Sequence, residues 1–330
     1  MIIMSLQDSF GRRARDLRIS LTQACTLRCR YCMPAEGLPL LPREELLSID
    51  EVARLIDIGV SDLGIDEVRL TGGEPLVRRD LEKLVATVRS RHADLPIALT
   101  TNAVGLARRA HDLRAAGVTR LNISLDTVDA ELFAQVTRRD RLADVVAGID
   151  AARDAGFAPI KVNAVALRST VSSASELLNW CIARGLELRF IENMPLDADA
   201  TWTASDLITA ADVLEELSRH HRLSPIGRVD PGAPAERWLV DDGPATVGII
   251  ASMTRPFCRT CDRTRITAEG RVRPCLFSDD EIDLRTAMRS GASDAEVAEL
   301  WQRVTARKSA GHAALGVLTH PRRTMGAIGG

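Results

Sequence analysis

Six of the seven cysteines in this 330-residue sequence are the residues that point most directly to chemistry. They form two groups of three: Cys25, Cys29 and Cys32, and Cys258, Cys261 and Cys275. The seventh, Cys181, stands alone in a helical pattern, where a buried apolar role is expected. Because an odd number of cysteines cannot complete a disulfide framework, the clustered thiols favour metal binding or catalysis.

The first group has the spacing Cys-x3-Cys-x2-Cys and follows a predicted strand. Three thiolates in one loop can hold three irons of a [4Fe–4S] cluster, which usually takes four cysteine ligands. The fourth iron is then open to bind the amino and carboxylate groups of S-adenosylmethionine (SAM) and to pass an electron to its sulfonium. Structural zinc prefers four ligands, and the sequence offers no fourth cysteine or histidine nearby.

The second group has the spacing Cys-x2-Cys-x13-Cys around a predicted hairpin. A zinc ribbon is the serious alternative, but a ribbon would need a second close pair of cysteines. A second cluster with an open iron fits better, and that iron could bind a nitrogen of a substrate such as a purine. Arg263 and Arg265 follow Cys261 closely, and their guanidinium groups can bind phosphates or a purine edge unless they are simply solvated surface.

The first two-thirds of the sequence alternates strand-like and helical segments. A helix over 51–58 is introduced by Ser48 and Glu51 in capping-box spacing, and Gly117, Gly156 and Gly185 suit left-handed helix ends. Six βα units ending near Pro195 predict a partial (β/α)6 TIM-like barrel, since a complete barrel takes ~250 residues. The predicted strands are 16–22, 67–71, 97–101, 120–126, 160–167 and 187–192.

Alternate residues of these strands are polar, although a barrel interior is usually filled with branched apolar side chains. Residues two apart on a strand share a face, so these side chains would line a polar and partly cationic lumen. Such a lumen predicts a large, hydrogen-bonding, anionic ligand. The alternative is that they face solvent at strand ends. The positions are Arg18, Ser20 and Thr22; Arg69, Thr71 and Gly73; Thr100 and Asn102; Asn122, Ser124 and Asp126; and Lys161 and Asn163.

The pattern changes after about residue 200. A helix is predicted over 207–221 and strands over 237–240 and 246–251, with a hairpin formed by 265–267 and 271–273. We therefore expect a barrel domain over 1–205 and a C-terminal α+β extension over 206–330 that carries the second cluster and ends in a Gly-Gly tail.

Several short motifs resemble the radical SAM superfamily, and within it the GTP 3′,8-cyclase family of molybdenum-cofactor biosynthesis. The Cys-x3-Cys-x-Tyr-Cys segment resembles the superfamily signature, and Gly72-Gly73-Glu74-Pro75 resembles its SAM-binding loop. The Cys-x2-Cys-x-Arg-x-Arg segment with Cys275 beyond it resembles the cyclases, as does the ending Gly329-Gly330. One departure is Ala103, where the family commonly has glycine.

The resemblance implies residue roles. Tyr31, Gly73, Ser124 and Met194 would bind SAM. Cys25, Cys29, Cys32, Arg263 and Arg265 would serve catalysis, and all six clustered cysteines would hold two [4Fe–4S] clusters. Arg189 is a further phosphate candidate. The residues that would bind GTP are Arg18, Arg69, Thr100, Lys161, Arg263, Thr264 and Arg265.

The implied activity is a radical SAM lyase that converts GTP to (8S)-3′,8-cyclo-7,8-dihydroguanosine 5′-triphosphate. The implied partners are a low-potential electron donor of flavodoxin or ferredoxin type, the next enzyme of the pathway (cyclic pyranopterin monophosphate synthase), and a second copy in a homodimer. A radical SAM enzyme that modifies a peptide is the first alternative, and a non-catalytic iron–sulfur or zinc sensor is the second.

The composition argues against some classes of binding partner. The net charge is −2 and the isoelectric point is about 6.3, so no overall field favours nucleic acid or an anionic membrane. No apolar run is long enough to span a bilayer, and the first ten residues lack the plan of a secretory signal. A cytoplasmic protein is expected.

Overall fold

One continuous sheet of twelve strands organises the computed structural model, which describes residues 5–311 and 321–329. Its central strands are parallel and follow chain order, as the βα pattern predicts. The ends of all six lie within two residues of the predicted ones. These strands are β1 (Asp16–Ser20), β2 (Glu67–Thr71), β3 (Ile97–Thr101), β4 (Arg120–Ser124), β5 (Ile160–Ala166) and β6 (Glu187–Glu192).

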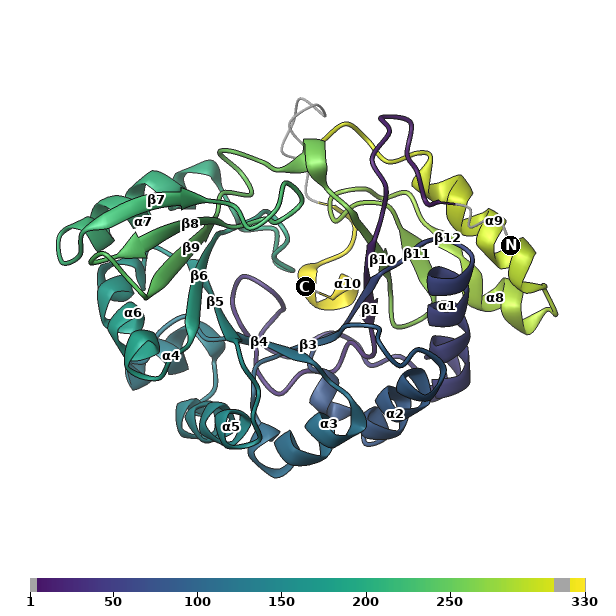
Figure 1. Ribbon diagram of the computed structural model, residues 1–330, viewed down its shortest axis with the longest axis horizontal. Helices are drawn as coiled ribbons and strands as arrows, with labels where there is room; N and C mark the ends of the chain where they lie inside the picture. The colour runs from purple at the N-terminus through teal and green to yellow at the C-terminus, as the bar shows by residue number, and fades with distance from the viewer. Residues whose placement is uncertain (1–4, 312–320, 330) are drawn as a thin grey trace.

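Helices cover the convex side of these strands (Figure 1). The predicted capping box opens α1: the Ser48 hydroxyl accepts from the Glu51 N–H at 3.2 Å, and the Glu51 carboxylate accepts from the Ser48 N–H at 2.8 Å. Gly117, Gly156 and Gly185 have φ of 116°, 78° and 67°, which confirms the left-handed helix ends. The helices are α1 (Ile49–Ser61), α2 (Leu81–Arg91), α3 (Ala110–Ala116), α4 (Ala130–Thr137), α5 (Leu142–Asp154) and α6 (Ala174–Ala183).

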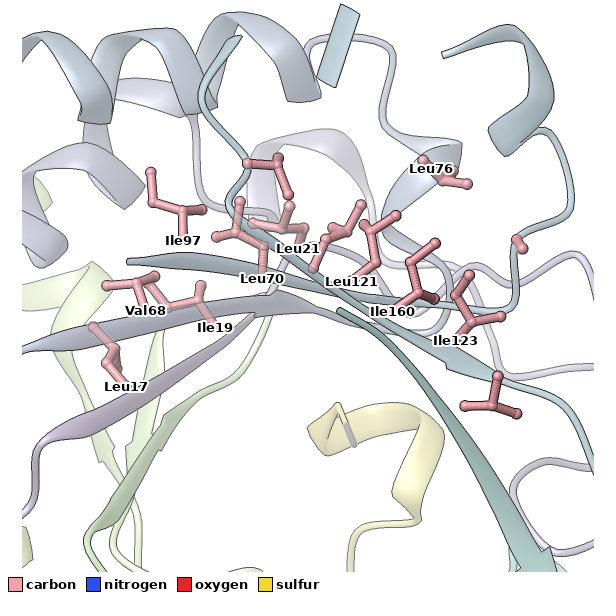
Figure 2. Close-up of a cluster of buried hydrophobic side chains, with 14 of the residues drawn as sticks. Leu17, Ile19, Leu21, Val68, Leu70, Leu76, Ile97, Leu121, Ile123 and Ile160 are labelled. Atoms are coloured by element: carbon pink, nitrogen blue, oxygen red, sulfur yellow. The ribbon is translucent and has the colours of Figure 1, made fainter. Parts of the chain in front are cut away.

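The two faces of the sheet differ in chemistry. Branched apolar side chains point from the strands toward the helices, where Leu17, Ile19, Val68, Leu70 and Leu121 form a buried layer (Figure 2). Because side chains alternate along a strand, the intervening polar residues face the concave side. The partial barrel encloses a cavity there, and seven of the thirteen predicted lumen positions line it: Arg18, Arg69, Thr100, Asn122, Ser124, Lys161 and Asn163.

The C-terminal part of the chain extends the sheet at both edges. One antiparallel group continues from β6: β9 (Thr246–Ile250), β8 (Glu236–Val240) and β7 (Leu223–Gly227). Another continues from β1: β10 (Arg263–Ile266), β11 (Arg271–Arg273) and β12 (Ile282–Asp283), which includes the predicted hairpin. The sheet therefore remains open, and the division near residue 205 stays a prediction.

Four further helices complete the described chain: α7 (Ala210–Ser218), α8 (Leu284–Arg289), α9 (Asp294–Thr305) and α10 (Met325–Ile328). The helix predicted over 207–221 is shorter at both ends, and its start at Ala210 is set by the Thr209 side chain, which accepts from the Asp212 N–H. Helix α10 lies within the concave side of the sheet (Figure 1). Among residues 5–311 and 321–329, no helix combines the length and apolar character needed to cross a bilayer.

Ala103 lies two residues beyond the end of β3 and is fully buried, with a left-handed φ of 63°. Glycine adopts this conformation without the steric cost that alanine has, which explains why glycine suits the position. The adjacent helix leaves no room here, because a Cβ added to Gly148 of α5 would lie 2.5 Å from the Ala103 carbonyl oxygen.

Cys181 is fully buried on α6 and belongs to the apolar core, as expected. Replacing Cys181 with alanine should leave the iron and sulfide content unchanged and lower the free energy of unfolding by about 1 kcal/mol. Chemical analysis and denaturant unfolding measure both. Cys275→Ala is the matched substitution and should reduce the iron content. An equal loss of iron in Cys181→Ala would contradict the assignment.

Candidate active site

A cavity of about 700 Å³ occupies the concave side of the sheet, a volume that suits a nucleotide-sized ligand. Side chains of β1 to β6 form one wall, and residues 256–258, 261–263, 265 and 274–277 of the C-terminal extension form another. Most predicted site residues meet here. Those lining the cavity are Arg18, Tyr31, Arg69, Thr100, Ser124, Lys161, Met194, Cys258, Cys261, Arg263, Arg265 and Cys275.

Three arginines from adjacent strands surround one buried carboxylate, that of Asp16. Its Oδ2 lies 3.4 Å from Arg18 Nε, 3.8 Å from Arg69 Nη2 and 3.8 Å from Arg263 Nε. Burial would raise the pKa of Asp16, but the neighbouring guanidinium groups hold it below its ordinary value. Strand register produces the cluster, since Arg18 of β1 pairs with Arg69 of β2 and with Arg265 of β10.

The positive charges of the cavity are poorly compensated. Burial, with repulsion from Arg18, lowers the pKa of Arg69 and of Arg265 to about 9 each. Burial likewise lowers the pKa of Arg189 to about 10. Arginine stays protonated in proteins, so these shifts report unfavourably placed positive charge. An anionic ligand would relieve it.

Acidic residues that line the cavity compensate part of this positive charge. Glu67 accepts from Arg69 Nη2 at 3.1 Å and also pairs with Arg120, and Glu187 lies 3.6 Å from Lys161 Nζ. Eight arginine and lysine side chains line the cavity against six acidic ones. Buried polar atoms of the lining, including Arg69 Nε, Arg189 Nε and Asn122 Nδ2, have no hydrogen-bond partner within the described chain. A bound polar ligand could satisfy them.

The first cysteine loop has the donor set that an iron–sulfur cluster requires. The Leu27 N–H and Asn102 Nδ2 donate to Cys25 Sγ at 3.4 and 3.5 Å. Burial raises the pKa of Cys25 to about 11 and that of Cys32 to about 12. A metal cation would stabilise the thiolate forms at these half-buried positions, and the type and spacing of the three cysteines suit a cluster. Their side chains do not line the cavity, whereas Tyr31 between them does.

Tyr31 is held in place by a buried acid at the end of β4. Its hydroxyl donates to Asp126 Oδ2 at 2.8 Å, while the Val165 N–H donates to Asp126 Oδ1 at 2.8 Å. Burial raises the pKa of Asp126 to about 6 against these two hydrogen bonds. The aromatic ring is thus fixed at the cavity wall, next to the first cysteine loop.

The Gly72–Pro75 segment packs tightly against that loop. A Cβ added to Gly73 would lie 2.5 Å from the carbonyl oxygens of Gln23 and Ala24, so only glycine fits. The Glu74 carboxylate is fully buried and accepts from the Leu76 N–H, the Asn102 N–H and the Thr101 hydroxyl. With its oxygens used inside the protein, Glu74 supports the loop. Gly73, which the resemblance assigns to SAM, is not among the residues that line the cavity.

The second cysteine loop joins β9 to β10. Buried Glu192, at the end of β6, fixes its start by accepting from the N–H groups of Met253 and Thr254 at 2.7 and 2.8 Å. Cys258, Cys261 and Cys275 all face the cavity. Across residues 5–311 and 321–329, no three His, Cys, Asp or Glu side chains converge closely enough to bind a single metal ion.

Comparison with known proteins identifies the family. The sequence is 58% identical to the GTP 3′,8-cyclase of Rhodococcus opacus (strain B4) over 329 residues, which cover 98% of this chain and 93% of that relative. This chain belongs to the GTP 3′,8-cyclase family. The cyclases of Paenarthrobacter nicotinovorans and Streptomyces coelicolor (strain ATCC BAA-471 / A3(2) / M145) are 50% and 51% identical, over 99% and 98% of this chain and 97% and 96% of theirs.

Two successive parts of the chain match two protein families. Residues 19–181 match the radical SAM superfamily, and residues 186–314 match Molybdenum Cofactor Synthesis C. Among solved structures, Streptococcus suis SuiB bound to S-adenosylmethionine superposes with a TM-score of 0.61 at 14% identity, covering 90% of this chain and 69% of that one. At that identity the likeness concerns the fold, which is the open barrel.

Thr264, one of the residues predicted to bind GTP, does not reach the cavity through its side chain. The Thr264 hydroxyl is buried on the opposite face of β10 and accepts from Trp301 Nε1 at 3.0 Å. Alternation along β10 sends Arg263 and Arg265 one way and Thr264 the other. Any contact of Thr264 with GTP therefore has to come from its backbone.

The C-terminal tail enters the cavity region. The Gly329 carbonyl accepts from Arg265 Nη1 at 3.0 Å, and a Cβ added to Gly326 would lie 3.5 Å from Cys32 Sγ. The tail thus approaches both the arginine cluster and the first cysteine loop. Gly330, the last residue of the predicted Gly-Gly ending, lies outside the described residues.

Sequence reasoning missed several cavity residues. Asp16 lies two residues before Arg18 on the same face of β1, so period-two alternation could have identified it. The same rule applies to Glu67 before Arg69. Arg120 could have been identified by noting that β4 begins with a charged residue whose side chain faces inward. No sequence signal points to Arg237, which reaches the cavity from β8.

Thr264→Val should lower the free energy of unfolding by about 1–2 kcal/mol, because the buried Trp301 N–H loses its acceptor. GTP affinity should stay within twofold of the unmodified protein. Thr100→Val is the matched substitution at a cavity position and should weaken GTP binding with less effect on stability. Denaturant unfolding and titration calorimetry measure the two quantities. Weak GTP binding by Thr264→Val would show that its side chain contacts the ligand.

Asp16→Asn should lower the free energy of unfolding of the ligand-free protein by roughly 2 kcal/mol, because the arginines lose their shared anion. GTP should stabilise this variant more than it stabilises the unmodified protein, since its phosphates supply the missing negative charge. Asp150→Asn is the control, because Asp150 also faces two arginines but is about half exposed, at 47% of its side chain. Equal stabilisation of both variants by GTP would contradict the role of Asp16.

Proposed function

We propose that this protein converts GTP to (8S)-3′,8-cyclo-7,8-dihydroguanosine 5′-triphosphate, the first step of molybdenum-cofactor biosynthesis. The observation that carries the proposal is the shared cavity. Arginine and lysine side chains line it, Tyr31 of the first cysteine loop borders it, and all three cysteines of the second group, Cys258, Cys261 and Cys275, face it. One bound nucleotide could touch all of these groups at once.

The cofactors of the proposed reaction are SAM and two [4Fe–4S] clusters. Cys25, Cys29 and Cys32 would hold the first, and Cys258, Cys261 and Cys275 the second. Tyr31, Gly73, Ser124 and Met194 would hold SAM. When bound and reduced, the first cluster and SAM together supply a 5′-deoxyadenosyl radical that removes hydrogen from unactivated carbon, and this difficult chemistry belongs to the cofactors.

The residues of the chain position the substrate. Arg18, Arg69 and Lys161 would bind the triphosphate, with Arg189 beside them, and Thr100 would add a neutral hydrogen bond. Arg263 and Arg265 would hold the nucleotide against the second cysteine loop. Because Arg265 also binds the Gly329 carbonyl, the tail would help fix the cationic wall and exclude water.

The same chemistry defines the partners. The reaction needs a low-potential electron donor, for which a flavodoxin or ferredoxin type is suited. Its product would pass to cyclic pyranopterin monophosphate synthase. We also propose a homodimer and a location in the cytoplasm, where the thiols stay reduced.

The lining of the cavity favours a nucleotide over a peptide. The cavity has eight arginine and lysine side chains against six acidic ones, and a triphosphate carries several negative charges that the excess can bind, whereas a peptide substrate does not require it. A sensor protein without catalysis would give no reason for Tyr31, Ser124 and Lys161 to border the same space.

Anaerobic reconstitution with iron and sulfide, followed by incubation with SAM, dithionite and GTP, tests the function directly. We expect 5′-deoxyadenosine to form together with a cyclised GTP derivative, and only when GTP is present. SAM cleavage with GTP left intact would show that the substrate assignment is wrong.

Lys161→Met should lower GTP affinity roughly 10- to 100-fold, because one charge-assisted contact to phosphate is lost. SAM affinity should not change. Lys83→Met makes the same substitution on the exposed side of α2, far from any predicted ligand, and should bind GTP normally. Equilibrium binding under anaerobic conditions separates the two variants. Equal GTP affinity in both would remove Lys161 from the triphosphate site.

A further inference from the structure

Lys308 is a buried lysine beside the second cysteine loop that no step above uses. It follows α9, and only 4% of its surface is exposed. Its Nζ donates to the Arg263 carbonyl at 2.9 Å, to the Cys261 carbonyl at 3.1 Å and to Cys261 Sγ at 3.4 Å. An ammonium group has three donors, and all three are used here.

The charge of Lys308 lacks a carboxylate partner. Within the described parts of the chain, no Asp or Glu forms an ion pair with it, and the sulfur of Cys261 is its one contact that can carry negative charge. Burying an ammonium group without a negative partner costs free energy, so a compensating negative charge is expected next to Lys308. A Cys261 thiolate bound to iron would supply the missing negative charge.

Arg12 is another basic residue beside this loop, and it differs from Lys308 in how its charge is compensated. Arg12 also binds this loop, through the Cys258 carbonyl at 2.6 Å and the Ser309 carbonyl at 2.5 Å. Its charge, however, is already compensated by the buried carboxylate of Asp8 at 2.6 Å. Arg12 therefore anchors the loop backbone, while Lys308 donates directly to a cysteine sulfur.

The residue type is also informative. Arginine is the usual basic residue of this chain, and Lys83, Lys161 and Lys308 are the exceptions. The planar fork of arginine suits two acceptors in one plane, whereas an ammonium group can serve three acceptors arranged around a point. The two carbonyls and one sulfur around Lys308 Nζ have that second arrangement.

We infer that Lys308 is a positioning residue that raises the reduction potential of the second cluster through its N–H···S contact with Cys261. The inference rests on the proposed second cluster. A cluster held by thiolates is negatively charged, and reduction adds further negative charge. A fixed, buried positive charge beside one thiolate favours the reduced form, and hydrogen bonds to cluster sulfurs are a known determinant of potential.

The test uses the full chain with Cys25, Cys29 and Cys32 changed to alanine, so that only the second cluster gives an EPR signal. A redox titration monitored by EPR gives its midpoint potential, and iron and sulfide analysis gives its occupancy. Lys308→Met should lower the midpoint by about 59 mV or more, which corresponds to at least a tenfold change in the one-electron equilibrium. Lys308→Arg keeps the charge and should stay closer to the unmodified protein.

Lys83→Met is the matched control, because it removes the same charge from an exposed helix, and its midpoint should not move. If Lys308→Met does not retain iron, Lys308→Gln and Lys308→Arg are compared instead, since they differ in charge. An unchanged midpoint at full iron content in the neutral variant overturns the inference. Absence of the signal with Lys308 intact overturns the proposed second cluster itself, and the two failures are thereby distinguished.

Discussion

The burial of several guanidinium groups inside one barrel is the constraint on which the rest of this structure depends. Arg18, Arg69 and Arg263 cannot lie this close together in an apolar core, because their mutual repulsion and lost hydration would go uncompensated. Asp16 supplies one shared anion, and the cavity supplies space for more. The buried apolar layer of strands β1 to β5 therefore lies on the convex side, between strands and helices.

The open sheet follows from the same constraint. The arginines near the second cysteine loop come from β10, which joins the free edge of β1 and brings Arg265 into register with Arg18. A closed barrel would have no edge to accept that strand. On the far side, β9 joins β6, and Glu192 ties the start of the second cysteine loop to the barrel. The C-terminal extension thus completes the cavity from both edges.

Much of this could be predicted from the sequence because it depends on local periodicity. The parallel strands, the polar lumen and the first cysteine group are encoded by residues two to four apart, and the second cysteine group by one close pair with a third cysteine fourteen residues later. Thr264 shows the limit of reading a site by resemblance, since alternation along β10 already places it opposite Arg263 and Arg265. Contacts between distant segments left no sequence signal. The contact of Lys308 with Cys261 joins residues 47 positions apart, and that of Arg12 with Cys258 joins residues 246 apart.

The most direct test of the account follows the hydrogen atom that the cavity is proposed to present. GTP carrying deuterium at C3′ is incubated anaerobically with the reconstituted enzyme, SAM and reductant, and the 5′-deoxyadenosine is analysed by mass spectrometry. If the cationic cavity holds GTP with its ribose toward the SAM site, deuterium appears in the deoxyadenosine. Deoxyadenosine that forms without deuterium would contradict this placement and the reaction proposed from it.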